Sequence, residues 1–317
     1  AQAYSKLWKL TKKEDYIKDL KSFLYIIDNR SLRSRHTFDC WAGHYFPYTA
    51  IDKSTLDENT PELIATSQVI NALVDSYKLL REDKLKQMAI SAYDFLIQNL
   101  LERLEAGVCF FKYSLTENDK IVLNASAQGL EALCRLRSVY VTDDMNDLCE
   151  KLAKFLIKCQ KEDGSWVYSM YNTGKVRNQL DFHQGYIIDG LLAYLQYAEN
   201  KNCLIDAIIK GAKFYKNVLF HNNGTSYYRY PIRYPIDIHN QAQGIITFCK
   251  LSILDPSYLN FAKTIASWTI SNMQDKSGYF YYQKWPFFIN KIPYMRWSQA
   301  WMMLALSTLM EHLRDEY

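Results

Sequence analysis

The amino-acid sequence predicts an all-α protein in which helical hairpins stand side by side in a closed two-layer ring, an α/α toroid. Two observations support this fold class. An apolar helix with a glutamine near its start recurs along the chain, and a second, amphipathic helix follows it and ends in a glycine turn with a short aromatic strand. A steady internal period indicates stacked units that bury their apolar faces against one another. The repeated glutamines, at steps of 60, 56, 59 and 56 residues, are Gln68, Gln128, Gln184, Gln243 and Gln299.

The glutamine-bearing helices are expected to form the inner layer of the ring. In the helix from Asp181 to Asn200, apolar residues such as Ile187, Leu191 and Leu195 recur at helical spacing. Helices that are apolar on most faces are typically buried, which places them inside the amphipathic ones. The predicted inner helices span residues 66–80, 124–136, 181–200, 237–251 and 296–310.

The amphipathic helices are expected to form the outer layer, with lysine and glutamate facing water. They are predicted at residues 13–28, 84–100, 143–160, 202–219 and 256–273. Glycine tolerates positive φ, so four glycines mark the turns that follow four of them. These turn residues are Gly107, Gly164, Gly224 and Gly278. The pattern predicts a single domain over residues 1–317, with about five to six hairpins.

Composition and charge argue against several classes of function. The net charge of +4, without a long basic run, argues against nucleic-acid binding. The chain has no apolar run of about 18 residues, so no membrane span is expected. Its seven cysteines form no CxxC pair, which argues against a disulfide framework or zinc site and favours a reducing compartment. We therefore expect a cytoplasmic protein without a metal ion or cofactor.

Polar residues gather where the predicted inner helices begin. Asp181 and His183 open one helix, Asp237 and His239 open the next, and Arg296 opens the last. In a ring of this kind these starts meet at one end, where helix N-termini favour a bound anion. An aspartate at such a position is also an ordinary N-cap, and this interpretation stays open for each aspartate taken alone.

Several short phrases are similar to known toroid families. FLIKCQKEDGSW, from Phe155 to Trp166, resembles the QW-type repeat of squalene cyclase and prenyltransferase toroids. The chain as a whole resembles α/α-toroid proteins encoded with bacterial surface-polysaccharide genes. NASAQGLEALCRL and DIHNQAQGIITFCKL resemble phrases in the toroid domain of glucuronyl C5-epimerases. The resemblance extends to toroidal polysaccharide lyases, and it implies a role in polysaccharide biosynthesis.

The phrase YYRYPIRYPIDIHNQ places Tyr230, Arg233 and Tyr234 just before Asp237 and His239. The resemblance to the lyases and epimerases implies a tyrosine and a histidine as proton donor and acceptor, with Asn or Arg neutralising the sugar carboxylate. Removing a proton next to a carboxylate requires that this charge be neutralised. A purely structural Arg–Tyr–Pro loop is the alternative interpretation.

The sequence therefore predicts an enzyme acting on an acidic, uronic-acid-containing saccharide by proton abstraction, as an epimerase or a lyase. Tryptophans at the mouth would stack on the sugar. The expected catalytic residues are His183, His239, Tyr230, Tyr234, Asp181 and Asp237. The expected substrate-binding residues are Asp39, Trp41, His44, Trp166, Arg233, Asn240, Gln243, Arg296 and Trp297.

Three other functions remain open at this level. A glycoside hydrolase on the same toroid would use a carboxylate pair chosen from Asp39, Glu62, Asp181 and Asp237. A non-catalytic saccharide-binding or scaffold protein of a polysaccharide-biosynthesis complex would bind without turnover. A terpenoid cyclase would need an apolar cavity with a lone acidic donor. We also expect a homo-oligomer or a partner from polysaccharide biosynthesis.

Overall fold

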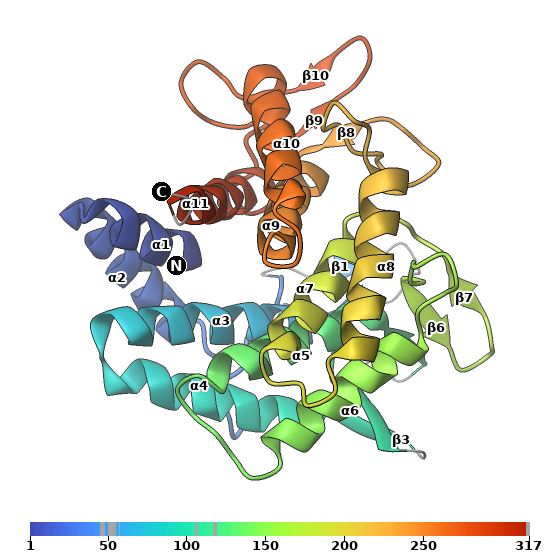
Figure 1. The fold of residues 1–317 in the computed structure, drawn as a ribbon. Helices are drawn as coiled ribbons and strands as arrows, with labels where there is room; N and C mark the ends of the chain where they lie inside the picture. The colour runs from blue at the N-terminus through green and yellow to red at the C-terminus, as the bar shows by residue number, and fades with distance from the viewer. Residues whose placement is uncertain (45–47, 50–54, 57, 105–106, 117–118, 315–317) are drawn as a thin grey trace.

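The computed structural model describes residues 1–44, 48–49, 55–56, 58–104, 107–116 and 119–314. Within these ranges eleven helices form two concentric layers, which confirms the predicted α/α toroid (Figure 1). The inner helices are α1 (Gln2–Thr11), α3 (Leu63–Leu80), α5 (Leu123–Leu136), α7 (His183–Leu195), α9 (Ile238–Leu251) and α11 (Trp301–Arg314). The outer helices are α2 (Glu14–Asn29), α4 (Asp83–Phe95), α6 (Met145–Lys158), α8 (Asn202–Leu219) and α10 (Ser257–Met273).

Helix α1 closes the ring, and the prediction of five repeat units omitted it. Each inner helix contacts the next one along the chain, from α3 to α11, and α1 contacts both α11 and α3. The segment was not recognised as a helix because it is short and carries Lys6 and Lys9 among its apolar residues. The observed ring therefore has six inner helices within the described residues, consistent with the upper end of the expected range.

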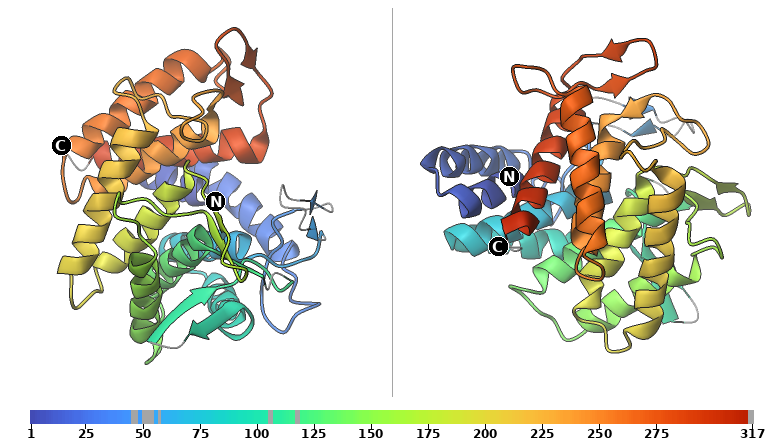
Figure 2. Two further views of the ribbon diagram at one scale, coloured as in Figure 1. Left: turned by 90° about the vertical axis from the view of Figure 1, so that its right-hand side faces the viewer. Right: turned by 45° about the horizontal axis from the view of Figure 1, so that its top comes forward.

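Short strands occupy the ends of the ring. They are β1 (Tyr48–Thr49), β2 (Thr55–Leu56), β3 (Leu101–Leu104), β4 (Val108–Phe111), β5 (Lys120–Val122), β6 (Ser169–Tyr171), β7 (Val176–Arg177), β8 (Ile236–Asp237), β9 (Gln283–Lys284) and β10 (Ile289–Asn290). All pairings are antiparallel, in the orders β1-β2, β3-β4, β5-β6-β7 and β10-β9-β8. The β9–β10 hairpin projects away from the ring (Figures 1 and 2).

The predicted turn glycines all adopt positive φ, and Gly164 shows why a side chain is excluded there. Its φ is +90°, and a Cβ would lie 2.4 Å from the carbonyl oxygen of Lys210 on α8. The turn after α6 therefore packs directly onto the backbone of the next outer helix. Glycine permits both the backbone conformation and this close approach.

The first turns of the inner helices fasten the aromatic segments through side-chain hydrogen bonds. Gln184 Oε1 accepts the backbone N–H of Trp166 at 2.8 Å, and Gln184 Nε2 donates to the Trp166 carbonyl at 2.8 Å. Gln299 holds Phe280 in the same two-sided way, at 2.9 and 2.7 Å. Because an extended segment would otherwise expose its peptide groups, each bond fixes the segment to the ring. The accepting side chains in the five units are Thr66, Ser126, Gln184, Gln241 and Gln299.

The repeated glutamines of the sequence therefore belong to two different positions. Gln184 and Gln299 fasten aromatic segments, whereas Gln68, Gln128 and Gln243 lie two residues beyond the equivalent positions. Gln68 Nε2 donates to Gln128 Oε1 at 2.9 Å, and Gln243 Nε2 donates to Asp189 Oδ2 at 3.1 Å. The predicted period is present in the structure. The five glutamines, however, occupy two different positions within the same turn of their helices.

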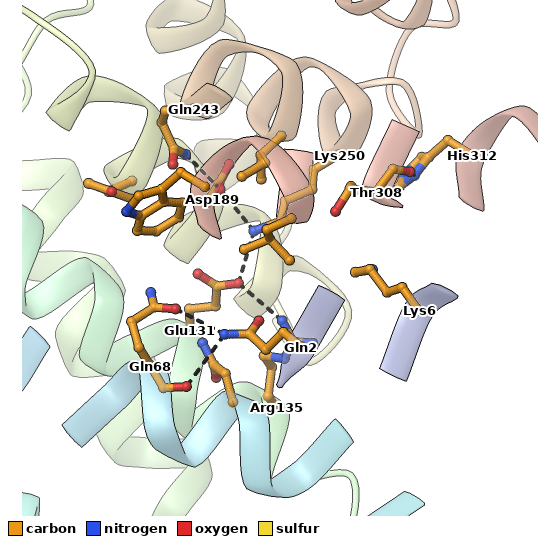
Figure 3. A pocket seen from close by; sticks show the side chains of 15 residues that line it. Gln2, Lys6, Gln68, Glu131, Arg135, Asp189, Gln243, Lys250, Thr308 and His312 are labelled. Atoms are coloured by element: carbon orange, nitrogen blue, oxygen red, sulfur yellow. Dashed lines mark hydrogen bonds and ion pairs between the residues drawn. The ribbon is translucent and has the colours of Figure 1, made fainter. Parts of the chain in front are cut away.

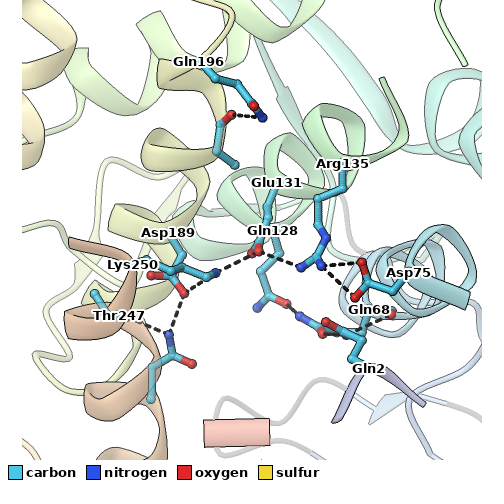
Figure 4. A network of polar contacts seen from close by, with 12 residues as sticks. Gln2, Gln68, Asp75, Gln128, Glu131, Arg135, Asp189, Gln196, Thr247 and Lys250 are labelled. Atoms are coloured by element: carbon cyan, nitrogen blue, oxygen red, sulfur yellow. Dashed lines mark hydrogen bonds and ion pairs between the residues drawn. The ribbon is translucent and has the colours of Figure 1, made fainter. Parts of the chain in front are cut away.

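A polar network joins side chains of the inner helices in the middle of the ring (Figure 4). Lys250 Nζ lies 2.8 Å from Asp189 Oδ2 and 2.9 Å from Glu131 Oε1. Arg135 pairs with Asp75 at 2.7 Å and approaches Glu131 at 3.6 Å. These charged side chains come from α3, α5, α7 and α9. The network therefore connects four inner helices through ion pairs, which define the position of each helix more specifically than apolar contacts would.

Among the helices that the structure describes, none has the length and apolar character needed to cross a membrane.

Candidate functional site

The N-terminal ends of the inner helices surround a cavity of about 980 Å³, hereafter the mouth cavity. Its wall includes the first turns of α3, α5, α7 and α9, together with the π-helical turn η3 (Met295–Ala300) and α11. The start of α1 and the end of α2 complete the wall. Small-molecule sites commonly have volumes of about 300–1,000 Å³, so the mouth cavity is large enough for more than one sugar ring.

Asp181 and His183 form a dyad at the start of α7. Asp181 Oδ1 lies 2.5 Å from His183 Nδ1 and also accepts the His183 backbone N–H at 3.1 Å. Burial alone would raise the pKa of Asp181, but the contacts with His183 and the hydrogen bond from Gln179 hold it below its usual value. Asp181 is thus an ionised group that orients the imidazole. His183 Nε2 has no hydrogen-bond partner among the described residues, and the ring lines the cavity.

His239 and Tyr186 form a second polar pair, one helix turn into the ring. The Tyr186 hydroxyl lies 2.6 Å from His239 Nε2, and His239 Nδ1 is buried without a hydrogen-bond partner. Burial, followed by the charges of His183 and Arg296, lowers the pKa of His239 well below its usual value. Burial also raises the pKa of Tyr186 well above its usual value. At neutral pH the pair is therefore a neutral imidazole beside a neutral phenol.

Asp237 has the position of an N-cap and is more than a cap. Its Oδ1 accepts the His239 backbone N–H at 2.9 Å and the Trp297 indole N–H at 3.1 Å. Its Oδ2 accepts from Gln283 Nε2 at 2.7 Å. Burial raises the pKa of Asp237, partly offset by these hydrogen bonds. The carboxyl group thus joins the start of α9 to η3 and β9.

An aromatic wall separates the two histidines. The Phe182 ring stacks on His183 with 4.1 Å between centroids and lies 4.3 Å from His239. The Trp297 ring lies 4.3 Å from His239 on another side. Phe182 therefore occupies the space between the imidazoles, and both histidines belong to one side of the cavity.

The charged residues of the mouth cavity are mostly cationic. Arg229 Nε lies 3.7 Å from Asp181 Oδ2, and Arg177 donates to Gln179 at 2.6 Å. Arg296 donates to the Gly43 carbonyl oxygen. Of the described lining residues, the acidic ones are Glu62, Asp181 and Asp237, whereas the Lys and Arg residues are Arg30, Lys120, Arg177, Arg229 and Arg296. This excess of positive charge favours an anionic ligand.

The floor of the mouth cavity is formed by residues that also line a smaller cavity of about 80 Å³ (Figure 3). The residues common to both are Gln2, Gln68, Tyr186, Trp301 and Leu304. Asp189 and Lys250 lie in the smaller cavity, away from the mouth. The central polar network thus supports the floor, and Tyr186 connects it to the mouth.

The structure brings nine of the expected site residues to the cavity. Asn240 lines it, and its amide donates to the carbonyls of Tyr227 at 2.6 Å and Tyr228 at 3.0 Å, which fixes the preceding loop. Trp41 lines it while donating its indole N–H to the Ile27 carbonyl at 2.8 Å. The nine are Trp41, His44, Asp181, His183, Asp237, His239, Asn240, Arg296 and Trp297.

The predicted tyrosine partners lie elsewhere, so this part of the predicted constellation is corrected. Tyr230, Arg233 and Tyr234 are not among the lining residues, and Tyr230 is 43% exposed with its ring against Tyr227. Arg233 lies over the Tyr234 ring, with 5.2 Å from its guanidinium carbon to the ring centroid. The loop turns outward before β8, because its inner edge is already fixed by Asn240.

Three further expected residues have structural positions outside the mouth cavity. Trp166 is completely buried and donates its indole N–H to the Leu156 carbonyl at 2.8 Å, so it is a core residue and not a stacking wall. Asp39 accepts from Ser31 at 2.5 Å and approaches Arg33 at 3.6 Å. Gln243 belongs to the smaller cavity.

Tyr186, Phe182 and Arg177 line the cavity but were not expected from the sequence. Tyr186 follows His183 by three residues, a spacing that places both on one face of a helix. This spacing is a sequence signal that favours Tyr186, and not Tyr230 or Tyr234, as the phenol beside the histidines. Arg177 lies on a short strand whose position the helical pattern does not define.

Comparison with known proteins identifies the fold of this chain but shows no family for it. No protein-family model matches the sequence, and no curated protein matches it. A cellobiose 2-epimerase from Bacillus thermoamylovorans is similar in structure, with TM-score 0.73 and 14% identity over 99% of this chain and 85% of that one. A GH76 α-mannanase from Bacteroides thetaiotaomicron has TM-score 0.77 and 13% identity over 99% and 84%. An unsaturated glucuronyl hydrolase from Bacillus sp. GL1, described as responsible for glycosaminoglycan degradation, has TM-score 0.69 and 12% identity over 99% and 83%. At such identities the likeness establishes the α/α-toroid fold alone.

Proposed function

We propose that this protein is a carbohydrate-active enzyme that removes the proton next to the carboxylate of a uronic acid residue, as an epimerase or a lyase does. The observation on which this rests is the Asp181–His183 dyad in a cation-rich cavity. The similar structures support a saccharide as substrate, because their names are those of enzymes acting on sugars. The glucuronyl hydrolase among them supports an acidic sugar.

His183 is the proposed proton acceptor. An imidazole whose Nδ1 is held by a carboxylate presents Nε2 to the substrate in a fixed tautomer. His183 meets this condition, since Nδ1 faces Asp181 and Nε2 is without a described partner. Abstraction breaks the C5–H bond, moves the proton to Nε2 and leaves the electron pair on the sugar carboxylate.

Tyr186 and His239 are proposed to stabilise the charge that develops on the carboxylate. A neutral phenol that remains protonated is a hydrogen-bond donor, and a preorganised donor in a dry site lowers the barrier most where charge appears. The expected role of His239 as a second acid or base is therefore replaced by this electrostatic one, since His239 is buried and its Nε2 is occupied by Tyr186.

Arg229, Arg296 and Arg177 are the proposed binding partners of the substrate carboxylate. A guanidinium binds a carboxylate through two parallel hydrogen bonds, which fixes the orientation of the acidic ring. Because these arginines come from three different segments, the substrate would contact the rim on several sides. Trp41 and Trp297 are the proposed stacking surfaces.

The test is incubation of the protein in D₂O with oligosaccharides containing glucuronate or mannuronate, followed by NMR of the sugar. The proposal predicts deuterium at C5, with or without a new double bond. An epimerase gives the inverted sugar, and a lyase gives the unsaturated one. Binding without deuterium uptake contradicts catalysis and favours the saccharide-binding protein that the sequence left open.

A glycoside hydrolase is the second candidate, and one observation favours it. The pKa of Asp181 is lowered while that of Asp237 is raised, and two carboxyls shifted apart are typical of an acid and a base in glycoside hydrolysis. Against this, Asp237 already accepts hydrogen bonds from Trp297, Gln283 and His239. New reducing ends without deuterium at C5 would identify the hydrolase.

Four expectations remain predictions. They are a place in surface-polysaccharide biosynthesis, a cytoplasmic location, a single-domain organisation, and assembly as a homo-oligomer or with a partner from polysaccharide biosynthesis.

A further inference from the structure

Inversion at a sugar carbon requires a second proton-transfer group that the first side of the cavity does not provide. A proton removed from one face of the carbon must be replaced by one delivered to the opposite face. His183 and His239 begin the neighbouring helices α7 and α9, and the Phe182 ring fills the space between them. Both histidines therefore face the substrate from the same side.

The opposite side of the ring follows from the order of the inner helices. In a closed ring of α1, α3, α5, α7, α9 and α11, helix α7 is opposite α1 and helix α9 is opposite α3 (Figure 1). Residues 42–44 lie between α3 and α11, on the α1 side. Ala42 pairs with Pro61 just before α3, and Arg296, before α11, donates to the Gly43 carbonyl. The segment is thus fixed across the cavity from His183.

This opposite wall contains a histidine beside a carboxylate. Glu62 is the N-cap residue of α3, is 3% exposed and lines the mouth cavity. His44 also lines it, with Nε2 at 3.7 Å from Glu62 Oε1. A Cβ on Gly43 would lie 2.2 Å from Glu62 Oε2, so glycine lets the backbone lie directly against the carboxylate. As with Asp181 and His183, a carboxylate group directly before an inner helix lies beside an imidazole, but here the contact is an ion-pair distance to Nε2 and not a hydrogen bond to Nδ1.

We propose that His44, which lies beside the Glu62 carboxylate, is the proton-transfer group for the second face of the sugar carbon, which makes the protein an epimerase. The inference rests on the proposed function. For one C5 epimer, His183 accepts the proton, the electron pair moves onto the carboxylate, and protonated His44 delivers a proton to the other face. For the other epimer, neutral His44 accepts the proton and protonated His183 returns one. No redox change occurs, and the sugar keeps its composition.

The charges around His44 are consistent with an imidazole that can both accept and donate a proton. Burial, followed by the charge of Arg296, lowers the pKa of His44, so the free protein presents a neutral acceptor at neutral pH. The groups facing it are Glu62 from α3, Arg296 from η3 and, across the cavity, the Asp181–His183 dyad from α7. A substrate carboxylate entering beside Arg296 would offset that positive charge and favour protonation of His44.

The experiment measures exchange and inversion separately, starting from each epimer. Oligosaccharides containing glucuronate, and separately its C5 epimer iduronate, are incubated in D₂O with the wild type, His44→Gln and His183→Gln. Wild type should exchange C5 hydrogen and interconvert both. His44→Gln should still exchange the epimer whose proton faces His183, should fail to exchange the other, and should invert at least about 100-fold more slowly. His183→Gln should show the mirror-image pattern.

Several results would overturn the inference. A role for His44 is excluded if the His44→Gln variant exchanges and inverts both epimers at the wild-type rate. It is also excluded if a folded His44→Gln variant loses exchange equally with both epimers. Absence of any exchange by the wild type contradicts the proposed function itself, a different failure. If His44→Gln unfolds, Glu62→Gln replaces it as the test of a positioning residue. Glu62→Gln should slow inversion more than exchange and shift its pH profile, and an unchanged pH profile with normal inversion also contradicts the inference.

Discussion

The carboxylate of Asp181 contacts His183 twice, at the imidazole Nδ1 at 2.5 Å and at the backbone N–H at 3.1 Å. The same residue pair thus defines where α7 begins and how the imidazole is oriented. One oxygen of Asp181 makes both contacts, so the same carboxylate group accepts a backbone N–H in the first turn of α7 and orients the imidazole. The catalytic role of this pair remains a proposal.

Asp181→Asn tests whether this orientation matters for turnover. The amide can donate to Nδ1 and stabilise the other tautomer, so Nε2 would carry the proton and could no longer accept one. We expect C5 exchange to fall by up to about 10⁴-fold, the loss known for a comparable tautomer change. NMR of C5 deuterium uptake measures it, with Asp163→Asn, at a turn outside the mouth cavity, as the control. Exchange within threefold of wild type would contradict the role of the dyad.

Tyr186→Phe tests the electrostatic role of the second pair. It removes the hydroxyl that lies 2.6 Å from His239 Nε2 and leaves the ring in place. Loss of one such donor typically costs about 10²–10³-fold in kcat. We expect kcat to fall with little change in KM, since the donor acts on the charge developing in the transition state. Tyr215→Phe, a buried tyrosine that does not line the mouth cavity, is the matched control. A change confined to KM would speak against the assignment.

Arg229→Gln tests recognition of an acidic sugar. A hydrogen bond to a charged group contributes about 1.5–3 kcal/mol, so affinity for a uronate oligosaccharide should fall about 10–100-fold. Affinity for the corresponding neutral, carboxyl-reduced oligosaccharide should stay unchanged. Calorimetric titration of both ligands measures the difference, and Arg233→Gln, outside the cavity, should leave both affinities at the wild-type value. Equal weakening of both ligands by Arg229→Gln would indicate a structural role.

The acid dependence of stability should report the same dyad. The pKa of Asp181 is lowered in the folded protein, so its stabilising contribution is present above about 4, its unfolded value, and is lost as pH falls further. Asp237 has the opposite sign, because its raised folded pKa means that stability is lost as pH rises above about 4. The difference in stability between the wild type and Asp181→Asn should therefore become smaller as pH falls from 5 to 3. Thermal unfolding of both proteins measures this difference. A constant gap across this range would contradict the assigned shift.

Lys250→Met tests the network at the centre of the ring. It leaves Asp189 and Glu131 without the cation that lies 2.8 and 2.9 Å away, and removing one partner of a buried ion pair costs about 3–5 kcal/mol. The Lys250 side chain is 27% exposed, so the lower part of that range is expected. Lys151→Met, which breaks an exposed pair with Asp147, should cost less than about 1 kcal/mol. Equal losses in urea unfolding would show that the network adds no more than a surface pair.

The ring could be predicted because its cause is periodic. Each unit places an apolar helix, an amphipathic helix and a glycine turn at a nearly constant interval, and such units bury their surfaces only by stacking. Helix α1 does not stand out in this pattern because it is short and interrupts its apolar residues with Lys6 and Lys9. Its helical state depends on contacts with α3 and α11, which a local pattern does not contain.

The mouth could be predicted only in part. Asp181, His183, Asp237 and His239 were identified because they open inner helices, and helix starts in a ring share one end. Tyr230 and Tyr234 were expected in the cavity from their nearness in sequence to His239, but the loop direction depends on the amide of Asn240 and on pairing with β9. The spacing of Tyr186 from His183 indicates a shared helix face, but the sequence does not show that this face points to the axis of the ring.

The central claim is that His183 moves a proton at the carbon beside a sugar carboxylate. The most direct measurement is the initial rate of deuterium uptake at C5 of a glucuronate-containing oligosaccharide in D₂O, compared between wild type and His183→Gln at equal ligand occupancy. The account predicts uptake by the wild type and at least about a 100-fold lower rate in the variant. Uptake at the same rate in both proteins, or binding by the wild type with no uptake, would contradict it.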